Sequence, residues 1–398
     1  MKKAVMYGGG NIGRGFIGQL LFQAGYSVGF VDVNKDLLNT LNTEKQYPVR
    51  ILKGDSYDEV MVQNVYGIDG SDIDAVASAI AEADICATAV GVNVLKFIVK
   101  PVKEGIVRRF TTGNKQPLDI IICENLIGAD EFLKGMISDL MTDEEKKFLD
   151  KVGFVEASIG RMVPVQTDEM KDGNPLRVCV ERYDRLPVDK AAFRGQLPPI
   201  ENLVPFSPFS YYIERKLFVH NMGHASTAYL GQYLGCAAIW ESIGHADVEL
   251  IVLRAMQASA LAMSKKYNVP YQGLNEHVEN LVYRFSNRQL GDTNARVGGD
   301  IKRKLSPNDR MIGALNLCKE QGVSADYLEI AIAASLLFTR DGEDKMDAET
   351  ILCDVAGLSK DDATYARIMG HYEMLVAKKP LAELIKAVKT KQGQAVIV

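Results

Sequence analysis

The chain has 398 residues, of which 47% are hydrophobic and 24% charged. This composition is typical of a folded globular protein, and the length is sufficient for two or three domains. The formal charge of −5 at pH 7 argues against nucleic acid as a partner, because such proteins normally present a basic face. No apolar stretch approaches the roughly 20 residues that span a bilayer, so we expect no membrane segment.

The first residues carry a glycine-rich pattern. An apolar stretch at 4–7 runs into the G-x-G-x-x-G of Gly8, Gly10 and Gly13, and a helix is predicted over 12–24. A second apolar stretch follows and ends at Asp32. Glycines permit a tight turn and close approach to a pyrophosphate, whose charge the helix N-terminus favours. The pattern predicts a dinucleotide-binding βαβ unit.

The acidic residue at the end of the second stretch bears on the choice of cofactor. A carboxylate at Asp32 can accept a hydrogen bond from a ribose 2′-hydroxyl and would repel a 2′-phosphate. We therefore predict NAD rather than NADP. The predicted cofactor-binding residues are Gly8, Gly10, Asn11, Ile12, Gly13, Asp32, Val90 and Gly91.

The next hundred residues alternate between strand-like and helix-like segments. A strand is predicted over 59–66, a helix over 72–82, and strands over 83–91 and 119–123. Nearly continuous apolar strands between amphipathic helices indicate a parallel sheet that is buried on both faces. Functional side chains of such sheets gather at the carboxyl ends of strands, where Val90, Gly91, Glu124 and Asn125 are expected to lie.

The character of the chain changes after about residue 150. Short strand-like segments occur at 154–157 and 176–181, and five of the thirteen prolines then fall between Pro187 and Pro208. This cluster marks a predicted domain boundary. Helical periodicity follows over 211–234, 246–266, 274–285, 324–337, 363–377 and 381–390.

These elements predict an α/β fold with two domains. Residues 1–200 are expected to form a Rossmann-type domain with a parallel sheet, and residues 201–398 an all-helical substrate and catalytic domain. The six cysteines lie far apart with no C-x-x-C pair, which is typical of a reduced, cytoplasmic protein. The five histidines form no zinc-binding pattern, so we expect no metal site.

One predicted helix carries a lysine, an asparagine and a histidine at close spacing. On an α-helix at 100° per residue, His224 would lie about 80° from Lys216 and Asn221 about 140° from it. A base, an amide and an imidazole on one arc suit hydride transfer, which needs a proton acceptor and dipoles for the alkoxide. A solvated lysine and a packed histidine are the structural alternative. Gly223 in mid-helix suggests close approach by a ligand or another backbone.

Several strings in the chain resemble the polyol-specific long-chain dehydrogenases, the mannitol dehydrogenase family. The Lys-x4-Asn-x2-His spacing at Lys216, Asn221 and His224 is similar to theirs. So are the strings at 9–18, 123–125, 214–218 and 223–231, and the likeness runs over nearly the whole chain. The resemblance implies that Lys216 is a general base that works without zinc, that Asn125 and Asn221 form an oxyanion hole, and that His224 positions the substrate and the lysine.

The resemblance also bears on the substrate. It implies NAD-dependent interconversion of D-mannitol 1-phosphate and D-fructose 6-phosphate, with Arg296, Arg303 and Lys304 at positions of substrate contact. Convergent cations suit a phosphate dianion, although a short basic segment is normally a solvated loop. The chain departs from the family pattern at Gly160 and Gly299.

Two alternatives to this reading stay open. One is the same reaction on an unphosphorylated polyol or a sugar acid, and the other is a non-catalytic NAD-binding regulator. The expected partner in the first reading is a small sugar or polyol phosphate. A monomer is favoured, with a dimer as the alternative.

Overall fold

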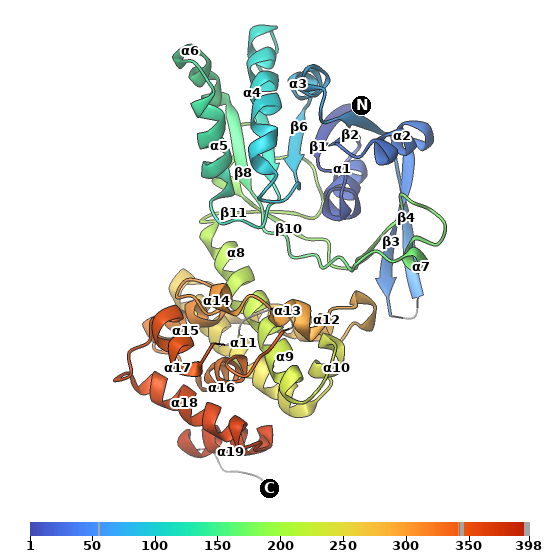
Figure 1. Ribbon diagram of the computed structural model, residues 1–398. Helices are drawn as coiled ribbons and strands as arrows, with labels where there is room; N and C mark the ends of the chain where they lie inside the picture. The colour runs from blue at the N-terminus through green and yellow to red at the C-terminus, as the bar shows by residue number, and fades with distance from the viewer. Residues whose placement is uncertain (55, 341, 343–345, 394–398) are drawn as a thin grey trace. The chain divides into compact units, whose positions relative to one another are not determined.

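The computed structural model describes residues 1–54, 56–340, 342 and 346–393. These residues form two compact units, Met1–Tyr212 and Ile213–Val398. The first unit contains the sheets and the second consists of helices (Figure 1).

A six-stranded sheet forms the centre of the first unit. Its order is β5-β2-β1-β6-β7-β8, and every neighbouring pair is parallel. The strand order therefore reverses between β1 and β6, which is where open α/β sheets bind ligands. The predicted Rossmann-type sheet is confirmed. Its strands are β1 (Lys2–Tyr7), β2 (Tyr26–Asp32), β5 (Val65–Asp69), β6 (Ile85–Thr88), β7 (Leu118–Ile122) and β8 (Val152–Glu156).

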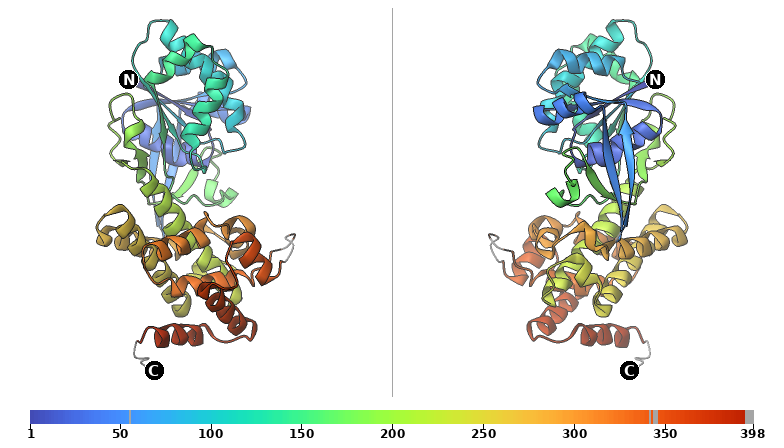
Figure 2. Two further views of the ribbon diagram at one scale, coloured as in Figure 1. Left: turned by 90° about the vertical axis from the view of Figure 1, so that its left-hand side faces the viewer. Right: turned by 90° about the vertical axis from the view of Figure 1, so that its right-hand side faces the viewer.

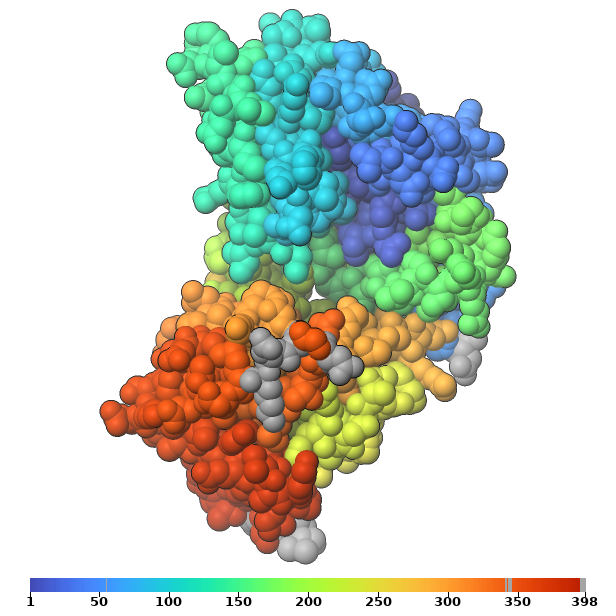
Figure 3. Space-filling view, viewed as in Figure 1, coloured from blue at the N-terminus to red at the C-terminus, as the bar shows by residue number. Residues whose placement is uncertain are grey.

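One face of this sheet packs against α3 (Ile73–Glu82), α4 (Leu95–Thr111) and α5 (Ala129–Asp139). Side chains alternate along a strand, so Val5 and Tyr7 of β1 belong to this core while Ala4 and Met6 belong to the core on the opposite face. Figure 1 shows α4 and α5 in front of the strands, and their atoms cover this face of the first unit in the space-filling view of Figure 3. Both faces of the sheet are buried, as its apolar strands predict.

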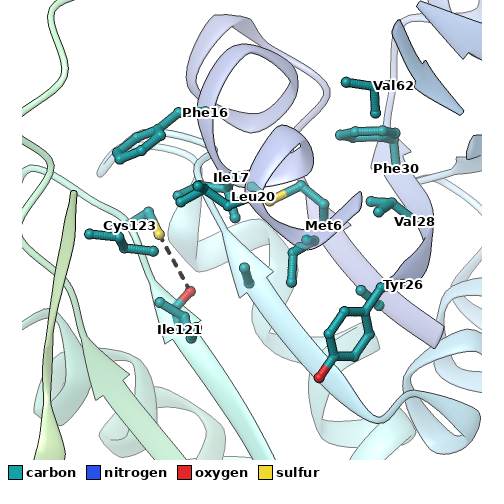
Figure 4. Packing of buried hydrophobic residues seen from close by; sticks show 14 of the residues in the cluster. Met6, Phe16, Ile17, Leu20, Tyr26, Val28, Phe30, Val62, Ile121 and Cys123 are labelled. Atoms are coloured by element: carbon teal, nitrogen blue, oxygen red, sulfur yellow. Dashed lines mark hydrogen bonds between the residues drawn. The ribbon is translucent and has the colours of Figure 1, made fainter. Parts of the chain in front are cut away.

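The opposite face packs against the helix that follows the glycine-rich loop. This helix begins at Asn11, runs through a π-helical segment, Gly13–Gly18, and continues as α1 (Gln19–Gln23), which confirms the helix predicted over 12–24. Phe16, Ile17 and Leu20 are buried with Met6 of β1 and Phe30 of β2 (Figure 4). The close-up also shows Cys123, whose thiol lies 3.9 Å from the Ile121 carbonyl oxygen in the same core.

A smaller sheet of three strands, in the order β4-β3-β9, packs beside this helix. The single strand predicted over 59–66 is wrong: β4 ends at Gln63, Asn64 adopts φ +56°, and β5 of the large sheet begins at Val65. A left-handed residue interrupts a strand, so the segment 59–66 contributes to two sheets. The remaining strands are β3 (Gln46–Lys53), β4 (Ser56–Gln63), β9 (Val178–Glu181) and the parallel pair β10 (Leu186–Asp189) and β11 (Leu203–Phe206).

The described part of the second unit is built of helices, with one isolated β-bridge between Ala238 and Thr293. The views in Figure 2 show it from two sides, and the predicted helical C-terminal region is confirmed. None of the helices described in the chain is long and apolar enough to cross a membrane. From α8 onward the helices are α8 (Ser210–Glu214), the π-helical segment Arg215–Asn221, α9 (Met222–Tyr233), α10 (Ile239–Ile243), α11 (Ala246–Tyr267), α12 (Tyr271–Phe285), α13 (Asn294–Gly298), α14 (Ile301–Lys304), α15 (Arg310–Glu320), α16 (Asp326–Ser335), α17 (Ala348–Thr350), the π-helical segment Ile351–Val355, α18 (Ala363–Val376) and α19 (Leu381–Lys391).

Short helices complete the first unit. They are α2 (Lys35–Glu44), α6 (Asp143–Lys146) and α7 (Asp168–Lys171). The chain also has short 3₁₀ segments at Lys147–Lys151, Lys190–Ala192 and Arg288–Leu290.

Candidate functional site

The glycine-rich loop leaves β1 at the point where the strand order reverses. Gly8 has φ +104°, and a Cβ there would lie 2.5 Å from the Ala89 carbonyl oxygen. A Cβ on Gly13 would lie 1.9 Å from the Gly8 carbonyl oxygen, so packing requires both glycines. At Gly10 an added Cβ would meet no described atom within 4 Å apart from those of the adjoining backbone. This open side suits the close approach of a pyrophosphate.

Asn11 and Ile12 form the first helical turn after the loop. Asn11 is exposed and Ile12 is partly buried. The first N–H groups of a helix have no partner within it, and the helix dipole favours an anion there. The predicted role of Asn11 and Ile12 in holding the phosphates of a dinucleotide is compatible with this position and stays a prediction.

The Asp32 carboxylate fixes the glycine-rich loop to the end of β2. Its Oδ2 accepts a hydrogen bond from the Gly9 N–H (2.8 Å), and its Oδ1 accepts from the N–H groups of Val33 (2.8 Å) and Asn34 (3.0 Å). A carboxylate has about four acceptor sites, so one stays open to a ribose hydroxyl. Asp32 thus has a structural task in addition to its predicted role in cofactor choice.

Val90 and Gly91 follow β6, beside the glycine-rich loop. Their N–H groups donate to the two oxygens of the buried Glu124 carboxylate, at 2.9 Å and 2.8 Å. Asn125 comes next in the chain and is exposed. The predicted cofactor residues Val90 and Gly91 are therefore held by a side chain that the sequence analysis placed at the sheet edge without a role.

Lys216 and Asn221 lie on a π-helical segment rather than on an α-helix. The N–H of Met222 bonds to the carbonyl of Leu217, five residues earlier, as a π-helix requires. The angles of 80° and 140° expected from α-helical geometry are therefore wrong for this segment. Asn221 comes five positions after Lys216, which is the i→i+5 spacing of a π-helix, so the two positions follow each other on one side of the segment. Single π-turns are frequent at functional sites.

The electrostatic surroundings of Lys216 favour its neutral form. Lys216 is partly buried, and this burial together with repulsion by the Arg310 guanidinium lowers the pKa of the Lys216 ammonium to about 8. Arg310 is held by Asp309, whose Oδ1 lies 2.8 Å from its Nε. An amine with a pKa near neutrality is suited to general base catalysis.

His224 is fixed by two contacts within the second unit. Its Nε2 lies 3.3 Å from Asp292 Oδ2, and its ring stacks on Phe285 with centroids 5.0 Å apart and planes at 14°. His224 and the Arg296 guanidinium together hold the pKa of Asp292 below its ordinary value, against the effect of burial. Asp292 therefore orients the imidazole, and the sequence analysis missed it because it lies in a loop far along the chain.

Gly223, next to His224, has a packing explanation. A Cβ at this position would lie 2.3 Å from the Met256 sulfur of α11. The expectation of close approach by a ligand or another backbone is therefore wrong, since a neighbouring side chain fills the space.

The predicted phosphate residues Arg296 and Arg303 each contact carboxylates. Arg296 pairs with Asp292, and Arg303 pairs with Asp300 and with Asp309, the latter at 3.2 Å. Both arginine side chains remain about half exposed, at 57% and 51%. A guanidinium carries five N–H groups, so either arginine can also bind a ligand while it keeps these carboxylate partners.

Lys304 is buried, in contrast to the two arginines. Its ammonium donates to the carbonyls of Val297 (2.7 Å) and Gly299, which fixes the loop before α14. Burial, with repulsion by Arg310 and Arg303, lowers the pKa of Lys304 to about 8.

At Gly299, where the chain departs from the family pattern, another cation stands close by. A Cβ added to this glycine would lie 2.5 Å from a terminal nitrogen of Arg340. Arg340 is a basic residue beside this segment that the sequence analysis did not single out.

Metal-binding groups are not found among the described residues: no cluster of three or more histidine, cysteine or acidic side chains there could hold an ion. The structure describes all six cysteines, and each carries a free thiol.

Comparison with known proteins assigns both parts of the chain. The family model described as "Mannitol dehydrogenase Rossmann domain" matches residues 2–202, and the one described as "Mannitol dehydrogenase C-terminal domain" matches residues 209–390. Two relatives carry the name mannitol-1-phosphate 5-dehydrogenase. The one from Brevibacillus brevis is 40% identical over 336 residues, which cover 84% of this chain and 86% of the relative. The one from Oceanobacillus iheyensis is 35% identical over 393 residues, which cover 95% and 100%.

Solved structures agree on the fold. The ternary complex of Pseudomonas fluorescens mannitol 2-dehydrogenase with NAD and D-mannitol matches with a TM-score of 0.70 at 16% identity, over 98% of this chain and 94% of that one. A substrate-free D-sorbitol dehydrogenase matches with a TM-score of 0.75 at 13% identity, over 94% and 93%. The two domain matches and the full-length relatives lead to one conclusion: the chain belongs to the mannitol dehydrogenase family.

Proposed function

We propose that this protein is an NAD-dependent dehydrogenase that interconverts D-mannitol 1-phosphate and D-fructose 6-phosphate without a metal. The observation that carries the proposal is Lys216, a partly buried lysine with a pKa of about 8 on one continuous helix with Asn221 and His224. The relatives named mannitol-1-phosphate 5-dehydrogenase, at 35–40% identity, support the substrate.

In this mechanism the neutral amine of Lys216 takes the proton of the alcohol as the carbonyl forms. The side-chain amide of Asn221 donates to the developing alkoxide, and His224, oriented by Asp292, positions the substrate hydroxyl. When bound, NAD supplies the acceptor for the hydride that leaves the substrate carbon. Asn125 is proposed as a second donor to the alkoxide on the resemblance alone.

The choice of NAD rests on the first unit. The open side of Gly10, the first-turn N–H groups of Asn11 and Ile12, and the unused acceptor site of Asp32 fit a dinucleotide with a free ribose 2′-hydroxyl. The free thiols of all six cysteines support action in the reducing cytoplasm. We propose a monomer as the working state.

A second candidate has one observation in its favour. Lys304 is buried and donates to two backbone carbonyls, so a phosphate would have to compete for it. The same reaction on an unphosphorylated polyol or a sugar acid avoids this competition.

One assay separates these readings. NADH oxidation is measured with D-fructose 6-phosphate, D-fructose and D-fructuronate side by side. The proposal predicts that kcat/KM is highest for fructose 6-phosphate. A higher value for fructose or fructuronate would establish the second candidate, and NADH binding without turnover of any substrate would indicate a non-catalytic regulator.

A further inference from the structure

A single buried carboxylate joins two loops at the carboxyl edge of the large sheet. Glu124 follows β7, and its side chain is 6% exposed. Its Oε1 accepts from the N–H of Val90 at 2.9 Å, and its Oε2 accepts from the N–H of Gly91 at 2.8 Å. Hydrogen bonds from neutral donors to a buried charge are among the stronger ones in proteins. The two loops therefore share one rigid connection.

The loop that Glu124 holds lies against the predicted pyrophosphate site. The carbonyl oxygen of Ala89, the residue before Val90, packs against Gly8 so closely that a Cβ on Gly8 would lie 2.5 Å from it. Gly91 has φ +90°, a conformation that side-chain-bearing residues rarely adopt. The backbone of residues 89–91 is thus fixed on one side by the glycine-rich loop and on the other by Glu124.

The loop that carries Glu124 also carries Asn125, and it is held at both ends. At its far end the N–H of Gly128 donates to Glu156 Oε1 of β8 at 2.9 Å. Asn125 is exposed and lies in the loop between Glu124 and Gly128, the two residues at which the loop is held. Its backbone position is therefore set by Glu124 on one side and by Glu156 on the other.

We propose that Glu124 is a positioning residue that couples the cofactor loop at 89–91 to Asn125, so that one carboxylate governs both cofactor binding and the orientation of this amide. The inference rests on the proposed function for the role of Asn125. A glutamine could not replace Glu124, because its NH₂ group would face one of the two N–H donors. The bidentate bridge needs a carboxylate of this length.

The chain offers a closely matched control. Asp119 lies on β7, the strand that Glu124 follows. It is also 6% exposed and accepts from two successive N–H groups, those of Arg194 (2.7 Å) and Gly195 (3.0 Å). Asp119→Asn therefore makes the same chemical change in the same sheet, away from the loops at 89–91 and 124–128.

The experiment compares Glu124→Gln with Asp119→Asn by thermal stability, NADH affinity from fluorescence titration, hydrogen exchange of the amides at 89–92 in the free protein, and steady-state kinetics. For Glu124→Gln we expect faster exchange at 89–92, an NADH Kd raised about tenfold and a kcat lowered about tenfold or more. For Asp119→Asn we expect a comparable loss of thermal stability, with NADH Kd and kcat within about twofold of the parent protein.

Equal losses of affinity and kcat in the two variants at equal loss of stability would overturn the proposal, as would unchanged exchange and affinity in Glu124→Gln. If Glu124→Gln does not fold, Glu124→Asp decides. We expect the Glu124→Asp protein, with its shorter carboxylate, to have a thermal stability between those of the parent protein and Asp119→Asn, and to bind NADH more weakly than the parent protein. An NADH affinity equal to that of the parent protein would refute the role of Glu124. Exchange and NADH affinity need no turnover, so they test this inference even if the sugar phosphate proves to be the wrong substrate.

Discussion

Replacing Arg310 with glutamine is expected to raise the pKa of Lys216 and to move the pH dependence of alcohol oxidation to higher pH. Arg310 is the charged group whose repulsion lowers the pKa of Lys216, second only to burial. The substitution removes the charge and keeps a polar side chain of similar reach. The substitution therefore tests whether the pH dependence of the reaction reports the protonation of Lys216, as expected if Lys216 is the general base.

The magnitude follows from the pKa itself. The pKa of Lys216 is about 8, against an ordinary value of 10.5. At pH 7.5 a pKa of 8 leaves about a quarter of the lysine neutral, whereas a pKa of 10.5 would leave about one part in a thousand. Because burial is the larger cause, loss of Arg310 should raise the pKa by about 0.5–1, which slows oxidation at pH 7.5 about three- to eightfold.

The assay is the pH dependence of kcat/KM in both directions, from about pH 6 to about pH 10. Oxidation should rise with pH through the pKa of Lys216, since the neutral amine accepts the proton. Reduction should fall over the same range, since the protonated form donates it. Both midpoints should move upward together in Arg310→Gln.

Lys319→Gln is the matched control, because it removes one positive charge from the same helix, α15, where Lys319 pairs with Asp362. Its pH profile should match that of the parent protein. An unchanged midpoint in Arg310→Gln, or the same shift in both variants, would refute the view that Arg310 tunes Lys216.

Three further predictions concern the rest of the site. Asp292→Asn should lower kcat about ten- to a hundredfold by weakening the contact with His224, with NADH affinity unchanged; parent-like kcat would show that His224 needs no such partner. Asp32→Ser should narrow the preference for NAD(H) over NADP(H) and also weaken NADH binding, because Gly9 loses its acceptor; titration with both cofactors checks this, and equal use of both by the parent protein would contradict it. Arg303→Gln should raise KM for fructose 6-phosphate about tenfold or more but not KM for NADH, and an unchanged KM would place the phosphate elsewhere.

The sheet of the first unit could be predicted because its strands are short apolar runs with clear breaks. The strand β3 was missed, and so was the start of β4, whose first residues are exposed and polar and lack the alternation that marks a half-buried strand. The helix α4 was also missed, because Pro101 lies within it and argues against a helix. Exposed or proline-containing elements depend on tertiary contacts that local patterns do not carry.

In the candidate site, too, some features could be predicted from local sequence patterns and others could not. The glycine-rich loop and the helix with Lys216 have local signatures, and both lie in the predicted elements. The π-turn at Lys216 has no such signature, so the angles predicted from α-helical geometry for Asn221 and His224 were wrong. Asp292 and Glu124 act across the fold on His224 and on the loop at 89–91, and such long-range partners cannot be read from spacing along the chain.

The measurement that tests the central claim most directly is turnover of Lys216→Met beside its NADH affinity. Methionine keeps most of the aliphatic stem but cannot carry a proton. The account predicts that kcat falls by about 10²–10⁴-fold in both directions, with NADH Kd within about twofold of the parent protein, since the first unit is untouched. Near-normal turnover with an unchanged pH profile would contradict it and would make Lys216 an ordinary structural lysine.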